Sequence, residues 1–330
     1  MKLYKIALSG GPCAGKTTIM CKIEEYFTAL GYKVILIEET ATNYITHGMT
    51  KENFPSAYDF QQKIFTLQMT KEDVAGSDAL DSGAEKILIV CDRGLPDNEG
   101  YLSPSDFYRL LKNNNITKQD ILLRYDAIFY LETIAKTDPN KYREICKDTI
   151  RTESPEKACE IDEKLLFAWG DHPNFFCEES GKTLEEKTSD ILKTLADLLE
   201  EEPIVEKKRY VIQKPDPTIF DAKKQRICLY KVGENDSIYS ISSDNSIRYK
   251  RIRDKGEEYI DGGRAADIIK SCGFSLRKIS FDQYAFFYDD NYMFVDVYDD
   301  LTNATLTVMK KTKGETKFPD GIKVIAPMIG

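Results

Sequence analysis

The chain has 330 residues, of which 42% are hydrophobic and 31% charged, and its formal net charge is −9. This composition excludes a disordered, fibrous or low-complexity protein, and the length predicts two domains of roughly 150 residues each. The eight cysteines form no C-x-x-C pair and only two histidines are present, which excludes both a disulfide scaffold and a zinc site of clustered Cys and His ligands.

The first half of the chain alternates strand-like and helix-like segments. We expect strands at residues 5–9, 33–38, 86–91 and 127–131, and helices at residues 16–30, 57–74 and 183–202. Strands that alternate with helices predict an α/β fold, in which a parallel sheet carries helices on both faces. This half therefore has the organisation of an α/β domain with a parallel sheet between two layers of helices.

The second half contains short runs rich in β-branched and aromatic residues, separated by turn residues. Expected strands are residues 206–213, 225–232, 238–242, 246–254, 281–288, 292–299 and 304–310, with one helix near 263–272. This pattern predicts a mainly-β, mostly antiparallel domain. The net charge changes from −12 over residues 1–202 to +3 over residues 203–330, and Pro203 cannot continue a helix. We therefore expect domains at 1–202 and 203–330.

The segment that follows the first strand fits the phosphate-loop pattern G-x-x-x-x-G-K-[ST] and has the strand before it and the helix after it that this pattern demands. Glycines let the backbone wrap around a phosphate, Lys16 supplies a cation, and the Thr17 hydroxyl is a ligand for Mg²⁺. The expected nucleotide-binding residues are Gly10, Gly11, Pro12, Cys13, Ala14, Gly15, Lys16, Thr17 and Thr18.

Charged residues end two of the expected strands. Because ligands bind at the carboxyl ends of parallel strands, Asp92 is a candidate for orienting Mg²⁺, and Arg93 for holding a phosphate or a second substrate. Glu38 and Glu39 end the second strand, and Glu39 is the candidate catalytic base. Solvated charges at strand ends remain the alternative.

Two further polar residues are candidates for the same cleft. Gln61 begins a helix that we expect to cover the cleft, where its amide can pair with a base edge or a hydroxyl, although a helix-surface position is the alternative. Arg151 lies in a charged segment after the fourth strand, where an arginine can stabilise a transferring phosphoryl group. A salt-bridged exposed helix explains Arg151 equally well.

Together these motifs resemble the TRPL translocation defect family. The resemblance is carried in the first half by residues 10–18, 38–42, 60–62, 91–94 and 151–153, and in the second half by residues 206–210, 249–253 and 294–298. It implies an AAA-type P-loop module, related to nicotinamide riboside and deoxynucleoside kinases, followed by a CYTH-like triphosphate-tunnel domain. The fold expected from it is a kinase-like parallel sheet and then an antiparallel β-barrel.

The resemblance also implies ligands. Lys16, Thr17 and Asp92 would bind GTP or ATP with Mg²⁺, Glu39 and Gln61 would lie near an acceptor pocket, and Lys208, Arg251 and Arg253 would meet anionic phosphates. Tunnel enzymes carry more carboxylates than the Glu206 and Asp296 found here, so we expect anion binding without hydrolysis in the second domain. The alternative is a basic lining paired internally with these two acids.

Two functions remain open from the sequence. The first is a regulatory or trafficking protein that binds a nucleotide and a phosphoinositide headgroup or polyphosphate, and the second is a kinase of nucleosides or other small molecules. Whether the chain is an NTPase, a kinase or no enzyme stays undecided. The acidic first half argues against nucleic-acid binding, and no run of 18 apolar residues occurs. We expect a cytoplasmic location, with peripheral contact to membranes left open.

Overall fold

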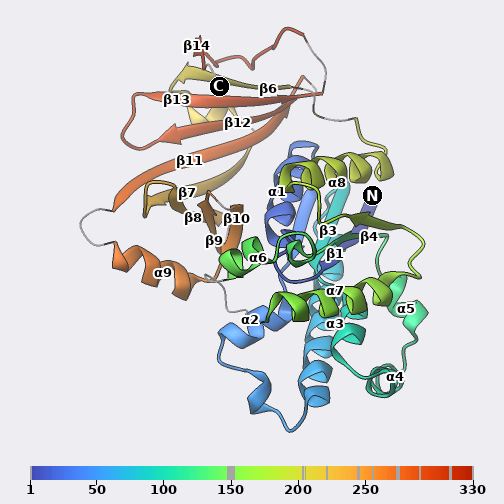
Figure 1. The fold of residues 1–330 in the computed structure, drawn as a ribbon. Helices are drawn as coiled ribbons and strands as arrows, with labels where there is room; N and C mark the ends of the chain where they lie inside the picture. Colours follow the sequence, from blue (N-terminus) through green and yellow to red (C-terminus); the bar gives the residue numbers. More distant parts are fainter. Residues whose placement is uncertain are drawn as a thin grey trace. The chain divides into compact units, whose positions relative to one another are not determined.

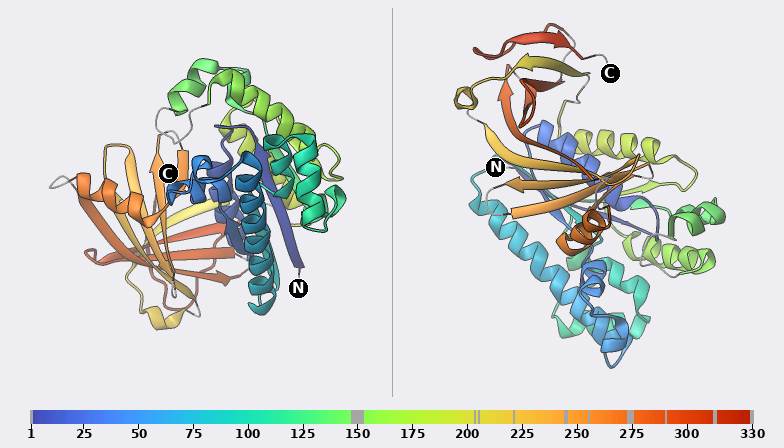
Figure 2. Two further views of the ribbon diagram at one scale, coloured as in Figure 1. Left: turned by 90° about the horizontal axis from the view of Figure 1, so that it is seen from below. Right: turned by 90° about the vertical axis from the view of Figure 1, so that its left-hand side faces the viewer.

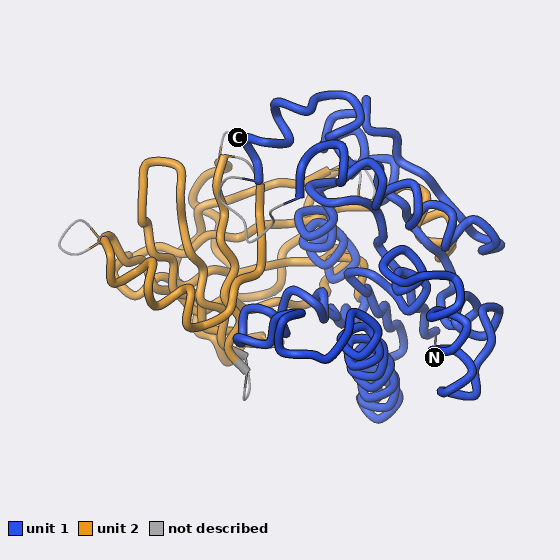
Figure 3. The backbone as a smooth tube through the Cα atoms, turned by 60° about the horizontal axis from the view of Figure 1, so that its bottom comes forward, with its two compact units in different colours: residues 1–28, 32–192 blue, residues 29–31, 193–330 orange. Residues whose placement is uncertain are grey.

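The computed structural model describes residues 2–146, 153–202, 204, 206–220, 222–243, 246–254, 256–272, 276–289, 291–311 and 314–328. The chain forms two compact units, Met1–Thr28 with Tyr32–Leu192 and Ala29–Gly31 with Lys193–Gly330 (Figure 3). The boundary between the units, at Leu192 and Lys193, lies within helix α8 (Leu184–Leu198). The domain boundary at 202/203 expected from the sequence stays a prediction.

The first unit is built on a parallel sheet of five strands with the order β2-β3-β1-β4-β5. The strands are β1 (Lys2–Gly10), β2 (Lys33–Ile37), β3 (Lys86–Asp92), β4 (Ala127–Leu131) and β5 (Phe175–Glu178). The expected parallel sheet is thus confirmed, and the sequence missed only β5. The central strands are apolar because both of their faces are covered, as is usual for parallel sheets.

Helices cover both faces of this sheet, with α1 and α8 on one face and α3 and α7 on the other (Figure 1). The long helices are α1 (Lys16–Ala29), α3 (Ala57–Asp81), α4 (Pro104–Asn113), α7 (Pro155–Trp169) and α8 (Leu184–Leu198). Shorter helical segments are α2 (Thr40–Thr46), η1 (Lys51–Asn53), η2 (Leu95–Tyr101), α5 (Lys118–Leu122), η3 (Ile134–Lys136) and α6 (Pro139–Cys146). None of the helices in the described residues is both long and apolar enough to cross a membrane.

Serine caps set where several of these helices begin. The Ser56 hydroxyl accepts a hydrogen bond from the Asp59 amide at 3.2 Å before α3, and Ser103 and Ser154 do the same before α4 and α7. Each hydroxyl satisfies an amide that has no partner within the helix.

A buried apolar cluster lies between the sheet and helix α7. Within this cluster Trp169 packs with Leu165 and Tyr125.

The second unit is built on an antiparallel sheet of nine strands with the order β10-β9-β8-β7-β11-β12-β13-β6-β14. The strands are β6 (Glu206–Gln213), β7 (Lys223–Lys231), β8 (Asp236–Ser243), β9 (Ser246–Arg253), β10 (Gly256–Ile260), β11 (Arg277–Tyr288), β12 (Asn291–Tyr298), β13 (Asn303–Lys310) and β14 (Val324–Pro327). The sequence predicted seven of these strands and missed β10 and β14. The expected antiparallel β fold is confirmed, and its assignment as a CYTH-like barrel remains a proposal.

One face of this sheet carries the apolar core of the unit. A buried cluster over β6, β11, β12 and β13 includes Val295, Leu306 and Val308. At the other end of the sheet, α9 (Gly262–Ser271) packs through Ala265 on Ile238 and Ile260, and lies against β8–β10 (Figure 2). The segment between residues 314 and 322 supplies Phe318 to the first cluster, and Phe220 after the short helix η4 (Pro217–Ile219) packs there as well.

Candidate functional site

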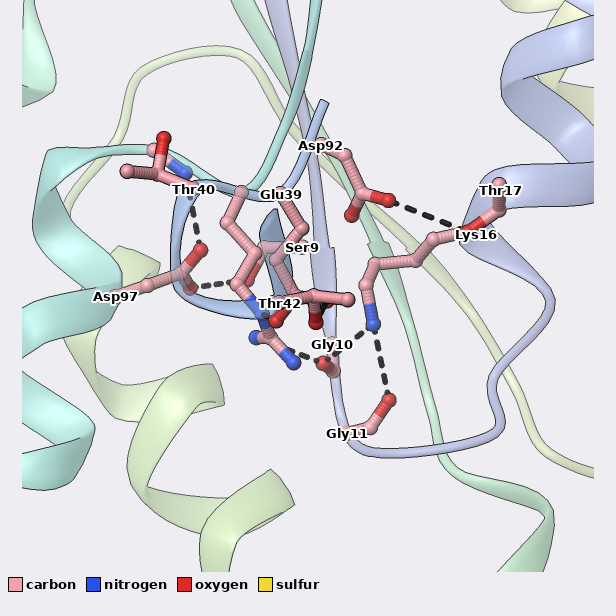
Figure 4. A network of polar contacts seen from close by, with 12 residues as sticks. Ser9, Gly10, Gly11, Lys16, Thr17, Glu39, Thr40, Thr42, Asp92 and Asp97 are labelled. Carbon is pink, nitrogen blue, oxygen red and sulfur yellow. Dashed lines mark hydrogen bonds and ion pairs between the residues drawn. The ribbon is translucent and has the colours of Figure 1, made fainter. Parts of the chain in front are cut away.

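The phosphate loop connects β1 to α1 and packs closely against β4. Gly10 has a φ of +133°, and a Cβ atom there would lie 1.9 Å from the carbonyl oxygen of Leu131, so only glycine fits. The Lys16 side chain is buried, and its Nζ lies 3.1 Å from the carbonyl oxygens of both Gly10 and Gly11 (Figure 4). The loop therefore holds a positive charge at the N-terminus of a helix, the arrangement that attracts phosphate.

A buried carboxylate outside the loop motif fixes the loop in place. Oδ1 of Asp162, on α7, accepts hydrogen bonds from the backbone amides of Gly11 at 2.7 Å and Thr133 at 3.1 Å, and Oδ2 lies 2.7 Å from Lys136 Nζ. Burial alone would lower the pKa of Lys136, but its interactions with Asp162 and Glu132 together outweigh burial and the pKa is raised. Lys136 thus remains charged beside Asp162. The sequence did not identify Asp162, because no local motif includes it.

The Thr17 hydroxyl donates a hydrogen bond to Oδ2 of Asp92 at 3.3 Å (Figure 4). Asp92 is the last residue of β3 and is 3% exposed. Carboxylate and hydroxyl oxygens are ligands that suit Mg²⁺, so these two residues fit the metal expected from the sequence. Within the described residues no three His, Cys, Asp or Glu side chains gather to hold a metal. A Mg²⁺ ion here would take most of its ligands from water and phosphate oxygens.

Glu39 and Arg93 form a shielded ion pair beside the loop. Nε of Arg93 lies 2.6 Å from Oε1 of Glu39, and Oε2 of Glu39 accepts a hydrogen bond from the Thr42 hydroxyl at 2.8 Å. Arg93 Nη1 also donates to the carbonyl oxygen of Gly10 at 3.3 Å. Burial disfavours the charged form of Arg93, but Tyr101, Glu39, Asp97 and Asp92 together outweigh it and hold the pKa of Arg93 well above its usual range. Arg93 is therefore a permanent cation.

A cavity of about 350 Å³ opens next to this ion pair. Glu39 and Arg93 line one part of it, and Gln61 and Phe60 of α3 line another. Gln61 is 6% exposed, so it is not the solvated helix-surface residue of the alternative interpretation. The mixture of apolar walls with a few polar groups is typical of a small-molecule site. The cavity brings together three of the residues predicted from the sequence.

Asn98, on η2, is a lining residue that the sequence did not reveal. Its Nδ2 donates a hydrogen bond to the carbonyl oxygen of Leu95 at 3.0 Å. Because a carbonyl only accepts, the amide must face Leu95 with its nitrogen, which turns Oδ1 away. Among the described residues neither Oδ1 of Asn98 nor Nη2 of Arg93 has a hydrogen-bond partner, although both atoms are buried. The cavity wall thus contains one acceptor and one donor that a ligand can satisfy.

A family model described as an AAA domain matches residues 5–187, more than half of the chain. The chain belongs to this AAA domain family. The matched segment contains the phosphate loop, Asp92 and the cavity, so the first unit is a P-loop nucleotide-binding module of the NTPase type. No curated protein matches the chain.

The remaining candidate of the AAA domain is Arg151, which lies outside the described residues. The nearby Arg143, on α6, is half exposed and lies 3.8 Å from Glu156. That position fits a salt-bridged helix surface, the alternative that the sequence left open for this segment.

The three basic residues predicted to bind anions in the second unit each have an acidic partner. Arg251 pairs with Asp236 at 2.5 Å, Arg253 with Glu258 at 2.7 Å, and Lys208 with Glu206 at 3.1 Å. The strand register places all three on the face that carries the apolar core. All three cations are therefore paired with acids, and two of the three partners are residues that the sequence had not identified. Anion binding by these residues stays a prediction.

The opposite face of the second sheet carries a separate polar cluster around Asp296. Gln283 donates to Oδ1 of Asp296 at 2.7 Å and Thr305 donates to Oδ2 at 3.3 Å. Burial raises the pKa of Asp296, although these hydrogen bonds and the charge of Arg209 act in the opposite direction. Asp296 is thus held mainly by neutral donors, and the internal pairing expected for a basic tunnel lining is found for Glu206 only.

Proposed function

We propose that the AAA domain binds ATP or GTP with Mg²⁺ at its phosphate loop and transfers the terminal phosphoryl group to a hydroxyl of a small molecule in the cavity. One observation carries this proposal: Arg93 lines the cavity and also donates a hydrogen bond to Gly10 of the phosphate loop. The phosphate site and the cavity therefore share a wall. This supports a kinase, the second of the two functions considered from the sequence.

The residues have distinct roles in such a transfer. Lys16 neutralises charge on the phosphates, and Asp92 with Thr17 orients the metal, which when bound supplies further positive charge. Glu39 accepts the proton of the acceptor hydroxyl, since it lines the cavity and its ion pair with Arg93 favours the carboxylate form. Asn98 and Gln61 orient the acceptor. Positioning and electrostatics supply most of the catalysis in phosphoryl transfer.

The test incubates the full chain with Mg²⁺, ATP or GTP and a panel of nucleosides, sugars and polyols, and detects phosphorylated products by mass spectrometry. We expect one class of acceptor to be phosphorylated, and Gln61→Leu to abolish this product while nucleotide affinity is kept. Half-buried Gln62, the next residue on α3, does not line the cavity and gives the matched control Gln62→Leu. Tight nucleotide binding without any product from the panel would contradict the proposal.

A regulatory role is the second candidate, and the basic strands of the second unit favour it. In this proposal the second unit is a CYTH-like domain that binds a phosphoinositide headgroup or a polyphosphate, at the periphery of a membrane or free in the cytoplasm. Lys208, Arg251 and Arg253 share one face, and Arg209 and Arg248 lie on the other. A phosphate would have to replace Asp236 as the partner of Arg251, which predicts weak, salt-sensitive binding.

The corresponding test titrates the full chain with tripolyphosphate and with vesicles containing phosphatidylinositol phosphates, each at two salt concentrations. Binding that weakens with salt and with Arg251→Ala supports the regulatory role. Binding to vesicles alone identifies a lipid headgroup, and binding to tripolyphosphate alone identifies a soluble anion. No binding to either ligand overturns this candidate and leaves the kinase proposal unaffected.

A further inference from the structure

Two thiols lie side by side at the edge of the phosphate loop. Sγ of Cys13, in the loop, lies 2.8 Å from Sγ of Cys146, the last residue of α6, and the two residues are separated by 133 positions in the sequence. Both residues are thiols and both are partly exposed. Two sulfurs are about 2.05 Å apart in a disulfide, so only a short movement of the side chains brings these atoms to bonding distance.

The surroundings hold the two thiols together. Cys13 and Cys146 pack against a small buried cluster of Ala135, Tyr142 and Ala158. The loop is fixed on this side by Thr133, whose hydroxyl donates to the carbonyl oxygen of Pro12 at 2.6 Å. The approach of the sulfurs thus follows from the packing of the loop against η3 and α6.

We propose that Cys13 and Cys146 form a thiol modification site, which a peroxide converts into a disulfide that lowers the affinity of the AAA domain for nucleotide. In the first step one thiol loses its proton, the thiolate attacks one oxygen of hydrogen peroxide and the O–O bond breaks. A sulfenic acid forms, and the hydroxide that leaves takes up the released proton to give one water. In the second step the other thiol attacks the sulfenic sulfur, the S–O bond breaks and a second water leaves. Two thiols and one peroxide thereby give one disulfide and two waters.

The bond affects the nucleotide site because Cys13 is part of the loop that surrounds the phosphates. Cys13 has a φ of +56°, in the left-handed region, so its backbone has little freedom to change. To bind phosphate, Lys16 must leave the carbonyl oxygens of Gly10 and Gly11 and the loop must adjust around the ligand. A covalent link from Cys13 to α6 opposes this adjustment.

Cys159 is the obvious competitor, because it borders the same cluster. Burial raises the pKa of the Cys159 thiol, which lowers its thiolate population and its reactivity. Its sulfur makes no contact comparable to the one between Cys13 and Cys146 among those the structure describes. Cys159 therefore provides the matched control for the proposed site.

The test treats the full chain with hydrogen peroxide, maps disulfides by mass spectrometry of peptides, and measures ATP and GTP affinity before and after dithiothreitol. We expect a peptide that links Cys13 to Cys146, and a loss of affinity that dithiothreitol restores by thiol–disulfide exchange. Cys146→Ser should bind nucleotide as the wild type does and keep its affinity after peroxide. Cys159→Ser should lose affinity as the wild type does.

Three results would overturn the proposal: no link between Cys13 and Cys146 in the oxidised wild-type chain, a link that leaves affinity unchanged, or a Cys146→Ser chain that still loses affinity. Disulfide mapping on the wild type needs no variant, so a poorly folding variant does not obscure the result. The affinity measurement requires no phosphoryl transfer, and failure of the proposed kinase function is therefore distinguishable from failure of this proposal.

Discussion

Arg93 joins Glu39 at the cavity wall to Gly10 of the phosphate loop. Arg93 Nε lies 2.6 Å from Glu39 Oε1 at the cavity wall, and Arg93 Nη1 lies 3.3 Å from the Gly10 carbonyl oxygen in the phosphate loop. The residue that holds the candidate base is thus also attached to the loop that binds the phosphates. Displacement of either side chain is expected to affect the distance between an acceptor and a nucleotide.

Glu39→Gln should lower phosphoryl transfer by about 10²- to 10⁴-fold, because a general base typically contributes this much and the amide cannot accept the proton. The amide still accepts a hydrogen bond from Arg93, so nucleotide affinity should stay unchanged. Product formation and equilibrium nucleotide binding are measured separately. A variant that transfers phosphate at the wild-type rate would remove Glu39 from the mechanism.

Lys16→Ala should weaken ATP or GTP binding about 10- to 150-fold, since a hydrogen bond to a charged group contributes roughly 1.5–3 kcal/mol. Calorimetric titration measures the affinity, and circular dichroism verifies that the fold is intact. Lys22, a partly exposed residue of the same helix that pairs with Glu25, supplies the control Lys22→Ala. Equal affinities of the Lys16 variant and the wild type would show that the phosphates bind elsewhere.

Asp92→Asn should abolish the increase in nucleotide affinity that Mg²⁺ produces, because the amide no longer supplies a negative charge beside Thr17. Affinity measured in EDTA should change little. The comparison of titrations with and without Mg²⁺ isolates the metal contribution. If the increase persists in the variant, Asp92 does not orient the metal.

Asp162→Ala should destabilise the AAA domain by about 3 kcal/mol, since loss of one partner from a buried ion pair typically costs this much. It also removes the acceptor for the amides of Gly11 and Thr133, so nucleotide affinity should fall as well. Urea unfolding measures the first effect and titration the second. Exposed Glu163 gives the control Glu163→Ala, and equal stability of the two variants would contradict the role assigned to Asp162.

Asp296→Asn should stabilise the second unit at neutral pH and leave its stability at low pH nearly unchanged. Burial raises the pKa of Asp296, so the folded chain binds this proton more tightly than the unfolded chain. Its contribution to stability is highest below the unfolded pKa of about 3.9 and falls as the pH rises through the folded pKa.

Asp299 provides the opposite case for comparison. Its hydrogen bond to Arg226 lowers the pKa of Asp299, so its contribution is present above the unfolded pKa and is lost as the pH falls through the folded pKa. Asp299→Asn should therefore destabilise the chain at neutral pH. Thermal unfolding of both variants between pH 2 and pH 7 distinguishes the two signs, and parallel pH profiles would show that burial does not control Asp296.

The sequence predicted the fold well where a segment has a strong pattern of its own. The strand Ala127–Leu131 and the strand Glu206–Gln213 were placed at their observed bounds. The missed strands have weak patterns: β5 has only four residues, β10 contains two successive glutamates, and β14 ends in a proline at the edge of the sheet. Their pairing comes from neighbouring strands and cannot be deduced from local preference.

The site residues also fall into two groups: those that a local sequence motif reveals, and those that only tertiary packing brings to the site. The phosphate loop is contiguous in the sequence, so its motif was visible. Asp162 and Cys146 reach that loop from 151 and 133 positions away, and only the packing of α6 and α7 brings them there. The acidic partners of Arg251 and Arg253 were equally hidden, because strand register selects them.

The position of β1 in the middle of its sheet determines when the nucleotide site can form during translation. Pro12 and the Thr133 that anchors it are 121 residues apart. At about 5–20 residues per second, a ribosome needs roughly 6–24 s to make the chain between them. Throughout that interval the nascent loop lacks the strand and hydroxyl that hold it, and it still lacks Asp162. Nucleotide can therefore stabilise the nascent chain only after α7 has left the ribosome.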